Sequence, residues 1–158
     1  MSHEKFMRRA MTCAKKAADL GEVPVGAVIV RDGKVIATGY NKREIGKNAL
    51  LHAEMIAIHR ACRKLGGWRL FDCDLYVTLE PCPMCTGAII NSRIRRVYIG
   101  AMDPKAGCLG SICNLPDLPF NHRPEIVHGV LSEECSRQLS EFFRALRKKK
   151  KSEKESQQ

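Results

Sequence analysis

The sequence predicts an α/β fold in which a mixed sheet is layered with helices, and three observations lead to this class. An opening segment with the apolar period of a helix is followed by a strong hairpin signal. After the hairpin, helical periods alternate with short apolar runs that are typical of strands. Hydrophobic residues make up 44% and charged residues 28% of the 158 residues, which suits one ordered domain. Such an alternation predicts a sheet that mixes antiparallel and parallel pairs.

The first predicted elements are a helix and a hairpin. Apolar residues three and four positions apart predict the helix over residues 2–20, and Gly21 is well placed to end it. Two apolar runs, residues 25–30 and 34–38, flank the turn residues Asp32-Gly33. Asp-Gly between two such runs favours a tight turn, so we expect a pair of antiparallel strands.

Helices and strands alternate through the middle of the chain. After a polar loop at residues 41–48, the apolar pattern predicts a helix over residues 52–65, which Gly66-Gly67 ends. A shorter helix is expected over residues 84–91. Three further strands complete an expected set of five, at residues 75–79, 96–100 and 125–128.

The C-terminal third combines an irregular segment with a last helix. Residues 101–119 contain several glycines and prolines and follow neither period, and irregular segments this long in a compact domain are often functional. Ser132 is expected to cap the last helix. The apolar face of this helix comprises Cys135, Leu139, Phe142, Phe143 and Leu146. We expect the domain to cover residues 1–146 and residues 147–158 to form a basic tail.

The chain is strongly basic, with 27 Lys and Arg against 17 Asp and Glu and a net charge of +10. Residues 144–158 carry seven basic and two acidic side chains, so about half of the excess lies at this end. A polyanionic partner, most simply nucleic acid, is one explanation, and a solvated tail that aids solubility is the other. Charge alone leaves both open.

Nothing in the sequence suggests export or membrane insertion. The first residues are charged and form no apolar signal core. The longest nearly apolar stretch, residues 23–30, is too short to cross a bilayer. We therefore expect a cytoplasmic protein, whose eight cysteines are reduced and in part available to bind a metal.

The residues that carry chemistry are His52-Ala53-Glu54 together with Cys82 and Cys85. The two cysteines stand three positions apart at a predicted helix start, where both sulfurs can reach one ion and the helix N-terminus favours thiolates. His52 begins another helix and adds a nitrogen ligand. This donor set suits zinc, and no second C-x-x-C and no H-x3-H supplies a fourth ligand. Three ligands leave a position for water, which indicates a catalytic site.

Glu54 fits a role in proton transfer. Residues two apart on a helix do not share a face, so Glu54 and His52 are not expected to bind one ion side by side. A carboxylate near the activated water can take its proton and return it to a leaving amine. H-x-E alone is common, and C-x-x-C alone also fits a redox pair or half of a zinc ribbon. Together, with prolines around the cysteines, they form the known signature of zinc nucleobase deaminases.

Nearly the whole chain resembles the bacterial-type tRNA adenosine deaminases, the TadA family. The similarity runs through residues 22–28, 76–85 and 121–123 and ends with Phe142-Phe143-Arg144 and the basic tail. It implies a three-layer α/β/α cytidine-deaminase-like fold with a central mixed five-stranded sheet, and a homodimer. The implied activity is hydrolytic deamination of adenosine to inosine at the wobble position of a tRNA anticodon, and the family suggests an arginine tRNA with the anticodon A-C-G.

The resemblance also assigns roles within the motif. His52, Cys82 and Cys85 are implied to bind one zinc ion per subunit, and Glu54 to shuttle protons for the zinc-activated water. Asn41 matches a family asparagine that hydrogen-bonds the flipped-out base, and the backbone of Ala53 is expected to contact the same base.

Two further segments match RNA-contacting regions of the family. Asp103 and Lys105 belong to a loop used against nucleotides that flank the target, and Phe143 and Arg144 begin the RNA-contacting C-terminus. The loop departs from the usual family pattern at Pro104, Cys108 and Leu109. Cys108 is also a conceivable fourth zinc ligand, although an isolated cysteine is more often a small buried hydrophobe.

Two other functions remain open from the sequence. A deaminase of a free base such as guanine shares the zinc motifs, but the basic tail argues against it. A non-catalytic RNA-binding module with structural zinc predicts a fourth protein ligand and no effect of Glu54→Ala beyond stability.

Overall fold

The computed structural model describes residues 2–157 and contains one sheet with the strand order β2-β1-β3-β4-β5. The strands are β1 (Gly26–Arg31), β2 (Lys34–Tyr40), β3 (Cys73–Leu79), β4 (Arg96–Ala101) and β5 (Glu125–Val127). β1 pairs antiparallel with both β2 and β3, whereas the pairs β3–β4 and β4–β5 are parallel. The predicted mixed five-stranded sheet is therefore confirmed.

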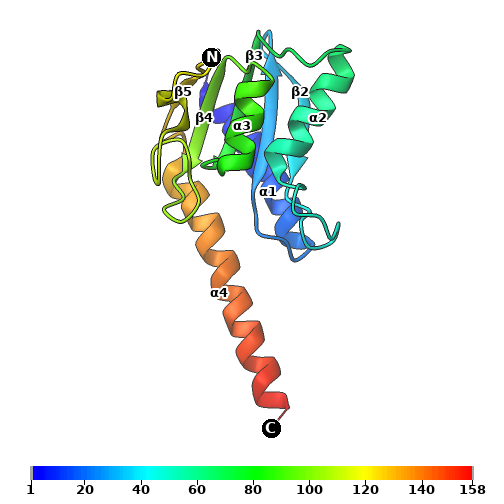
Figure 1. The fold of residues 1–158 in the computed structure, drawn as a ribbon. Coiled ribbons are helices and arrows are strands. Elements are labelled where there is room, and N and C mark those ends of the chain that lie inside the picture. Colours follow the sequence, from blue (N-terminus) through cyan, green and yellow to red (C-terminus); the bar gives the residue numbers. More distant parts are fainter. Residues whose placement is uncertain (1, 158) are drawn as a thin grey trace.

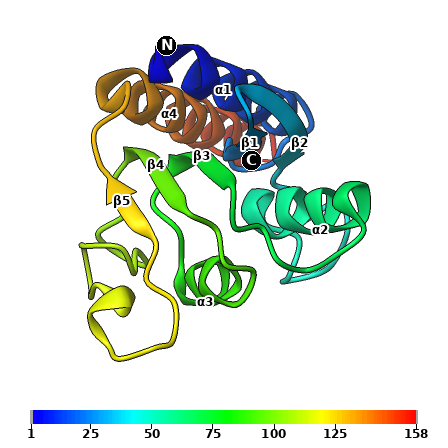
Figure 2. The ribbon, with the colours of Figure 1, turned by 90° about the horizontal axis from the view of Figure 1, so that it is seen from above.

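Helices cover both faces of this sheet. They are α1 (His3–Asp19), α2 (Ala53–Leu65), α3 (Pro83–Asn91) and α4 (Ser132–Ser156), with a short 3-10 turn η1 (Leu115–Asp117). Figure 2 shows α1 and α4 on one face and α2 and α3 on the other, which gives the expected α/β/α layers. No helix among residues 2–157 is both long and apolar enough to cross a membrane.

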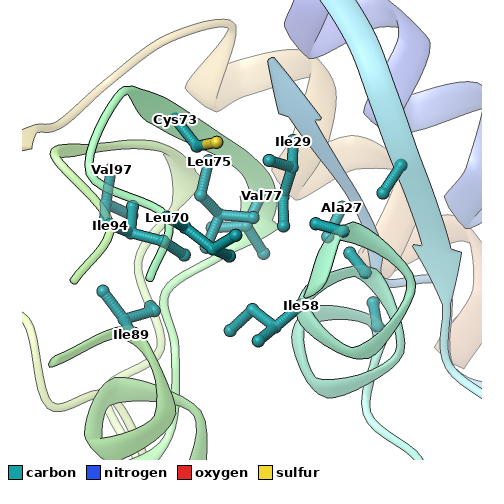
Figure 3. Close-up of a cluster of buried hydrophobic side chains, with 14 of the residues drawn as sticks. Ala27, Ile29, Ile58, Leu70, Cys73, Leu75, Val77, Ile89, Ile94 and Val97 are labelled. Atoms are coloured by element: carbon teal, nitrogen blue, oxygen red, sulfur yellow. The ribbon is translucent and has the colours of Figure 1, made fainter. Parts of the chain in front are cut away.

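Each face of the sheet has its own core because side chains along a strand alternate between faces. Towards α2 and α3, β3 directs the fully buried Leu75 and Val77, which pack with Ile29, Ile58 and other apolar side chains (Figure 3). Towards α1 and α4, the neighbouring residues of β3 and β4 stack as Tyr76 on Tyr98, with ring centroids 4.4 Å apart. The β3 strand is therefore buried on both sides and anchors the two layers.

The last helix continues through most of the segment expected as a basic tail. It begins at Ser132, with Leu131 at the N-cap and no capping hydrogen bond from a side chain. It runs without a break through residue 146 to Ser156, so residues 147–156 of the expected tail are helical, and Gln158 lies outside the described residues. Alanine, leucine, arginine and lysine all favour helices, and no glycine or proline interrupts them here. Figure 1 shows this half of α4 projecting from the body of the protein.

The strand directions determine where a site can form. Because β1 is antiparallel to β2 and β3, the strands β2, β3, β4 and β5 all point the same way. Their carboxyl ends therefore meet at one edge of the sheet, which is where ligands bind in open α/β sheets. The loops after β2, β3 and β4 begin at Asn41, Glu80 and Met102.

The contact between α1 and β1 requires glycine at position 26. A Cβ atom there would lie 1.9 Å from the carbonyl oxygen of Ala10, so Gly26→Ala should lower the free energy of unfolding by about 1–3 kcal/mol or more. Gly87 lies inside α3, and a Cβ atom there would meet no other atom within 4 Å. Because alanine favours a helix more than glycine does, Gly87→Ala should raise the free energy of unfolding by about 0.5–1 kcal/mol. Urea unfolding of both variants measures the difference, and equal effects would contradict this packing.

Candidate active site

The starts of α2 and α3 lie side by side at the carboxyl edge of the sheet. α2 follows β2 and α3 follows β3, and these two strands are parallel to each other. His52 is the N-cap of α2, and Cys82 is the N-cap of α3. Pro83 takes the first position of α3, where the missing N–H needs no partner. Gly39 lets β2 approach α2, because a Cβ atom there would lie 2.3 Å from the carbonyl oxygen of Ala53.

This arrangement brings the three predicted ligands together. The Nδ1 atom of His52 lies 3.6 Å from the Sγ of Cys82 and 3.5 Å from the Sγ of Cys85. All three ligand atoms lie within 4.8 Å of one another, and no fourth His, Cys, Asp or Glu of residues 2–157 joins this cluster. Tetrahedral bonds of ~2.3 Å to sulfur and ~2.0 Å to nitrogen separate these atoms by roughly 3.5 Å. The cluster therefore fits a zinc ion.

The protonation of the two cysteines and His52 favours binding of a cation. Hydrogen bonds with Cys85 and His52 lower the pKa of Cys82 to about 4, against the opposing effect of burial. The hydrogen bond to Cys82 raises the pKa of the His52 ring. Cys85 is fully buried, and its contact with the Cys82 sulfur, followed by desolvation, raises its pKa. The cluster thus holds an anionic sulfur with protons that a metal ion would displace.

Glu54 lies beside this cluster in the first turn of α2. It is only 3% exposed, and burial raises its pKa to about 7. The His52 ring acts in the opposite direction and lowers this pKa, but its effect is smaller. The carboxyl group is therefore close to half-protonated at neutral pH, which suits a group that both accepts and donates a proton.

A cavity of about 480 Å³ opens over the cluster and Glu54. It is lined by most of the predicted site residues, namely Asn41, His52, Ala53, Glu54, Cys82, Asp103, Lys105 and Phe143. Val23, Val25, Leu79, Met102 and Leu139 supply apolar walls that the sequence analysis did not identify. Arg144 lies in an adjoining cavity, which it shares with Lys105, Phe143 and Arg147. An apolar pocket with a few convergent polar groups is the usual form of a small-ligand site.

Two of the predicted substrate contacts also stabilise their own loops. The amide of Asn41 donates to the carbonyl oxygen of Val23 at 3.2 Å and accepts from the backbone N–H of Arg43 at 3.1 Å. The carboxylate of Asp103 accepts backbone N–H groups of Lys105 and Ala106 at 3.1 and 3.3 Å. Each side chain keeps spare hydrogen-bonding capacity at the cavity wall.

Glu80, which the sequence analysis did not identify, holds the loop that carries Asp103 and Lys105. Its carboxylate is 2% exposed and accepts backbone N–H groups of Asp103, Leu109 and Ser111, together with the Ser111 hydroxyl. Burial raises the pKa of Glu80, but these hydrogen bonds outweigh it and the net pKa is lowered. Gly107 makes room, because a Cβ atom there would lie 2.1 Å from the carboxyl carbon.

Glu22 plays the same part for the loop after β2. It is 1% exposed and accepts the backbone N–H groups of Glu44 and Ile45 at 3.0 and 2.7 Å. In the sequence, Glu80 directly follows an apolar strand and Glu22 directly precedes the apolar stretch of residues 23–30. Both walls of the cavity are thus tied to the body by buried carboxylates.

Cys108 does not join the metal cluster. It is buried, and its thiol lies 3.6 Å from the carbonyl oxygen of Ala106. Cys113 is exposed on the same irregular segment. Cys108 is therefore a buried residue of the irregular segment whose thiol donates to a carbonyl of the same segment.

Known proteins resemble the chain in both sequence and structure. The family model of the cytidine and deoxycytidylate deaminase zinc-binding region matches residues 1–101. A tRNA-specific adenosine deaminase of Bacillus subtilis is 54% identical over 149 residues, which cover 94% of this chain and 92% of the relative. A solved structure from a study of A-to-I editing by tRNA:A34 deaminases at the wobble position superposes with a TM-score of 0.83 and 43% identity. That match covers 85% of this chain and 99% of the other.

A guanine deaminase of Bacillus subtilis is a more distant structural match. Its TM-score is 0.63 at 38% identity, over 94% of this chain and 95% of that one. Of these two solved structures, the tRNA:A34 deaminase has the higher TM-score and the higher identity. The chain belongs to the cytidine and deoxycytidylate deaminase family and, within it, to the tRNA-specific adenosine deaminases.

Proposed function

We propose that this protein converts adenosine to inosine by hydrolysis at the wobble position of a tRNA anticodon. The observation that carries the proposal is Glu54, a buried carboxyl with a pKa of about 7 that shares one cavity with a three-ligand metal cluster. Relatives named as tRNA-specific adenosine deaminases support the choice of substrate.

His52, Cys82 and Cys85 would hold zinc, one ion per subunit. Zinc supplies a Lewis acid that makes a water molecule acidic enough to ionise near neutral pH. The described residues offer three ligands and no fourth, which supports a catalytic site over the non-catalytic module with structural zinc.

Glu54 moves the protons of the reaction. Water adds to the ring carbon that bears the amine, and Glu54 takes the proton that this water loses. Glu54 then gives a proton to the amine, the carbon–nitrogen bond breaks, and ammonia leaves. Burial raises the pKa of Glu54, which favours its holding a proton between the two transfers.

The cavity walls position the base. We assign the Asn41 amide and the Ala53 backbone to contacts with the flipped-out adenine, since both line the cavity next to Glu54. Phe143 is 39% exposed at the rim and offers an aromatic face to a flanking nucleotide. Asp103, Lys105 and Arg144 surround the same opening and would contact the neighbouring nucleotides, including their phosphates.

Assembly and location are part of the proposal. A homodimer is supported by apolar side chains exposed after β4, where Ile112, Leu118 and Phe120 are 60%, 54% and 49% exposed. A tRNA-modifying activity fits the cytoplasm. The arginine tRNA with anticodon A-C-G remains the expected substrate.

The reaction is tested with a synthetic anticodon stem-loop that carries adenosine at the wobble position. Wild-type protein should form inosine, and Glu54→Ala should lower the rate by at least roughly 100-fold because no group replaces the proton transfers. Glu4→Ala, which changes an exposed carboxylate, is the control. Nucleoside mass spectrometry measures the product. Turnover of free guanine with an inert stem-loop would support the guanine-type alternative instead.

The metal assignment predicts an unequal effect of two cysteine substitutions. Cys82→Ser should remove most of the bound zinc, since a hydroxyl is a poor replacement for a thiolate ligand. Cys113→Ser changes an exposed cysteine outside the cluster and should leave about one zinc per chain. Elemental analysis of the purified proteins gives the zinc content. Retention of zinc by Cys82→Ser would contradict the assignment.

The raised pKa of Glu54 predicts how pH affects the metal-free protein. Burial favours the protonated form, so the contribution of Glu54 to stability is full below pH 4.5 and is lost as pH rises through about 7. Glu54→Gln stays neutral throughout. Between pH 4.5 and 8 the wild type should therefore lose up to about 3 kcal/mol relative to Glu54→Gln. Urea unfolding of both proteins at the two pH values measures this difference, and a constant difference would contradict it.

A further inference from the structure

We propose that the exposed half of α4 binds the phosphates of the double-helical stem that carries the target loop. The contact surface is a row of basic side chains, here called the basic stripe: Arg144, Arg147, Lys148, Lys151 and Lys154. The identity of the RNA rests on the proposed function, whereas the stripe itself follows from the geometry of α4.

The stripe lies on one face of the helix. With 3.6 residues per turn, its five residues fall within a sector of roughly 120° around the α4 axis. Lys149 projects from the opposite side, and Lys150 lies outside the sector. Every residue from 147 to 157 is exposed, so this face of α4 has no partner within the described chain.

The stripe begins at the active-site opening. Arg144 and Arg147 line the cavity that adjoins the catalytic one, together with Ser140, Phe143 and Lys105. Ser140 points to nearly the same side of α4 as the centre of the stripe, and Phe143 lies about 20° beyond the edge of its sector. A nucleic acid that places one base beside Glu54 therefore has the stripe along its path as it leaves the cavity.

The length of the stripe favours a stem over the loop. Residues 144 to 154 span about 15 Å along the helix axis, and α4 projects clear of the sheet over this length (Figure 1). The loop that contains the target base is engaged at the cavity, so the next part of the molecule is its stem. Proteins recognise RNA duplexes chiefly through shape and backbone contacts, which flexible lysines and arginines provide.

Within the described chain, no ion pair holds the side chains of the stripe, although Glu155 shares their face of the helix one residue beyond Lys154. None of the ion pairs formed among residues 2–157 involves a stripe residue. Like charges three and four positions apart destabilise a helix by about 0.2–0.5 kcal/mol per pair. A row of phosphates would remove this repulsion and release counterions, which makes a polyanion the complementary partner.

The test compares two double variants of equal charge. Lys148→Ala/Lys151→Ala removes two stripe lysines, and Lys149→Ala/Lys150→Ala removes two lysines outside it. Fluorescence anisotropy measures the binding of zinc-loaded protein to a labelled anticodon stem-loop at several salt concentrations. The stripe variant should bind the stem-loop about tenfold more weakly. The slope of log affinity against log salt concentration should become shallower by about two, because two phosphate contacts are lost. The control should stay within about twofold of the wild type.

A linear oligonucleotide with the loop sequence separates stem from loop. It lacks a duplex, so the stripe variant and the wild type should bind it equally. If both double variants lose the same affinity for the stem-loop, the proposal is wrong and the net charge of α4 attracts the RNA without a specific face. If neither variant loses affinity, the proposal is also wrong and the stripe contacts only solvent. An equal loss on the linear RNA would overturn the assignment to the stem. Inosine formation by the wild type, measured in parallel, reports on the proposed function independently of these comparisons.

Discussion

The position of β1 is the constraint on which the site depends. Because β1 lies antiparallel between β2 and β3, these two strands run in the same direction and their following helices begin at the same edge. That topology places the N-cap of α2 within 3.6 Å of the N-cap sulfur of α3, although His52 and Cys82 lie thirty residues apart. Both helix N-termini carry partial positive charge, which favours the anionic sulfur at their junction.

The same edge also depends on buried carboxylates. Burying an anion is costly unless hydrogen bonds replace its hydration, and Glu80 and Glu22 recover that cost from backbone N–H groups. Each of these carboxylates fixes one loop of the cavity. Glu54 accepts fewer hydrogen bonds to offset its burial, and its pKa rises as a result. Three buried glutamates at one site thus serve different purposes, and the supply of hydrogen-bond donors decides which one is poised to exchange a proton.

The sequence predicted the elements and the metal cluster because both depend on local patterns. Apolar runs predict strands such as β3, and the spacing of Cys82 and Cys85 on one helix turn is a local geometric fact. The role of Glu80 could not be predicted, since it depends on the backbone of a loop that begins more than twenty residues later. The C-terminal end of α4 was not predicted, for another reason. A lysine run is compatible with both tail and helix, and only the unbroken helical residues before it favour the helix.

The distribution of charge between the cavity and α4 links chemistry to binding. A lysine or arginine of α4 beside Glu54 would add a second positive charge to that of the metal site, favour the ionised carboxylate further, and weaken Glu54 as a proton donor. Among charged groups, His52 and Cys82 act most strongly on Glu54, and neither comes from α4. The positive charge needed for RNA is instead concentrated at the cavity rim and along a helix that projects from the body. Affinity for a polyanion can therefore increase along α4 without placing another positive charge next to the carboxyl that moves protons.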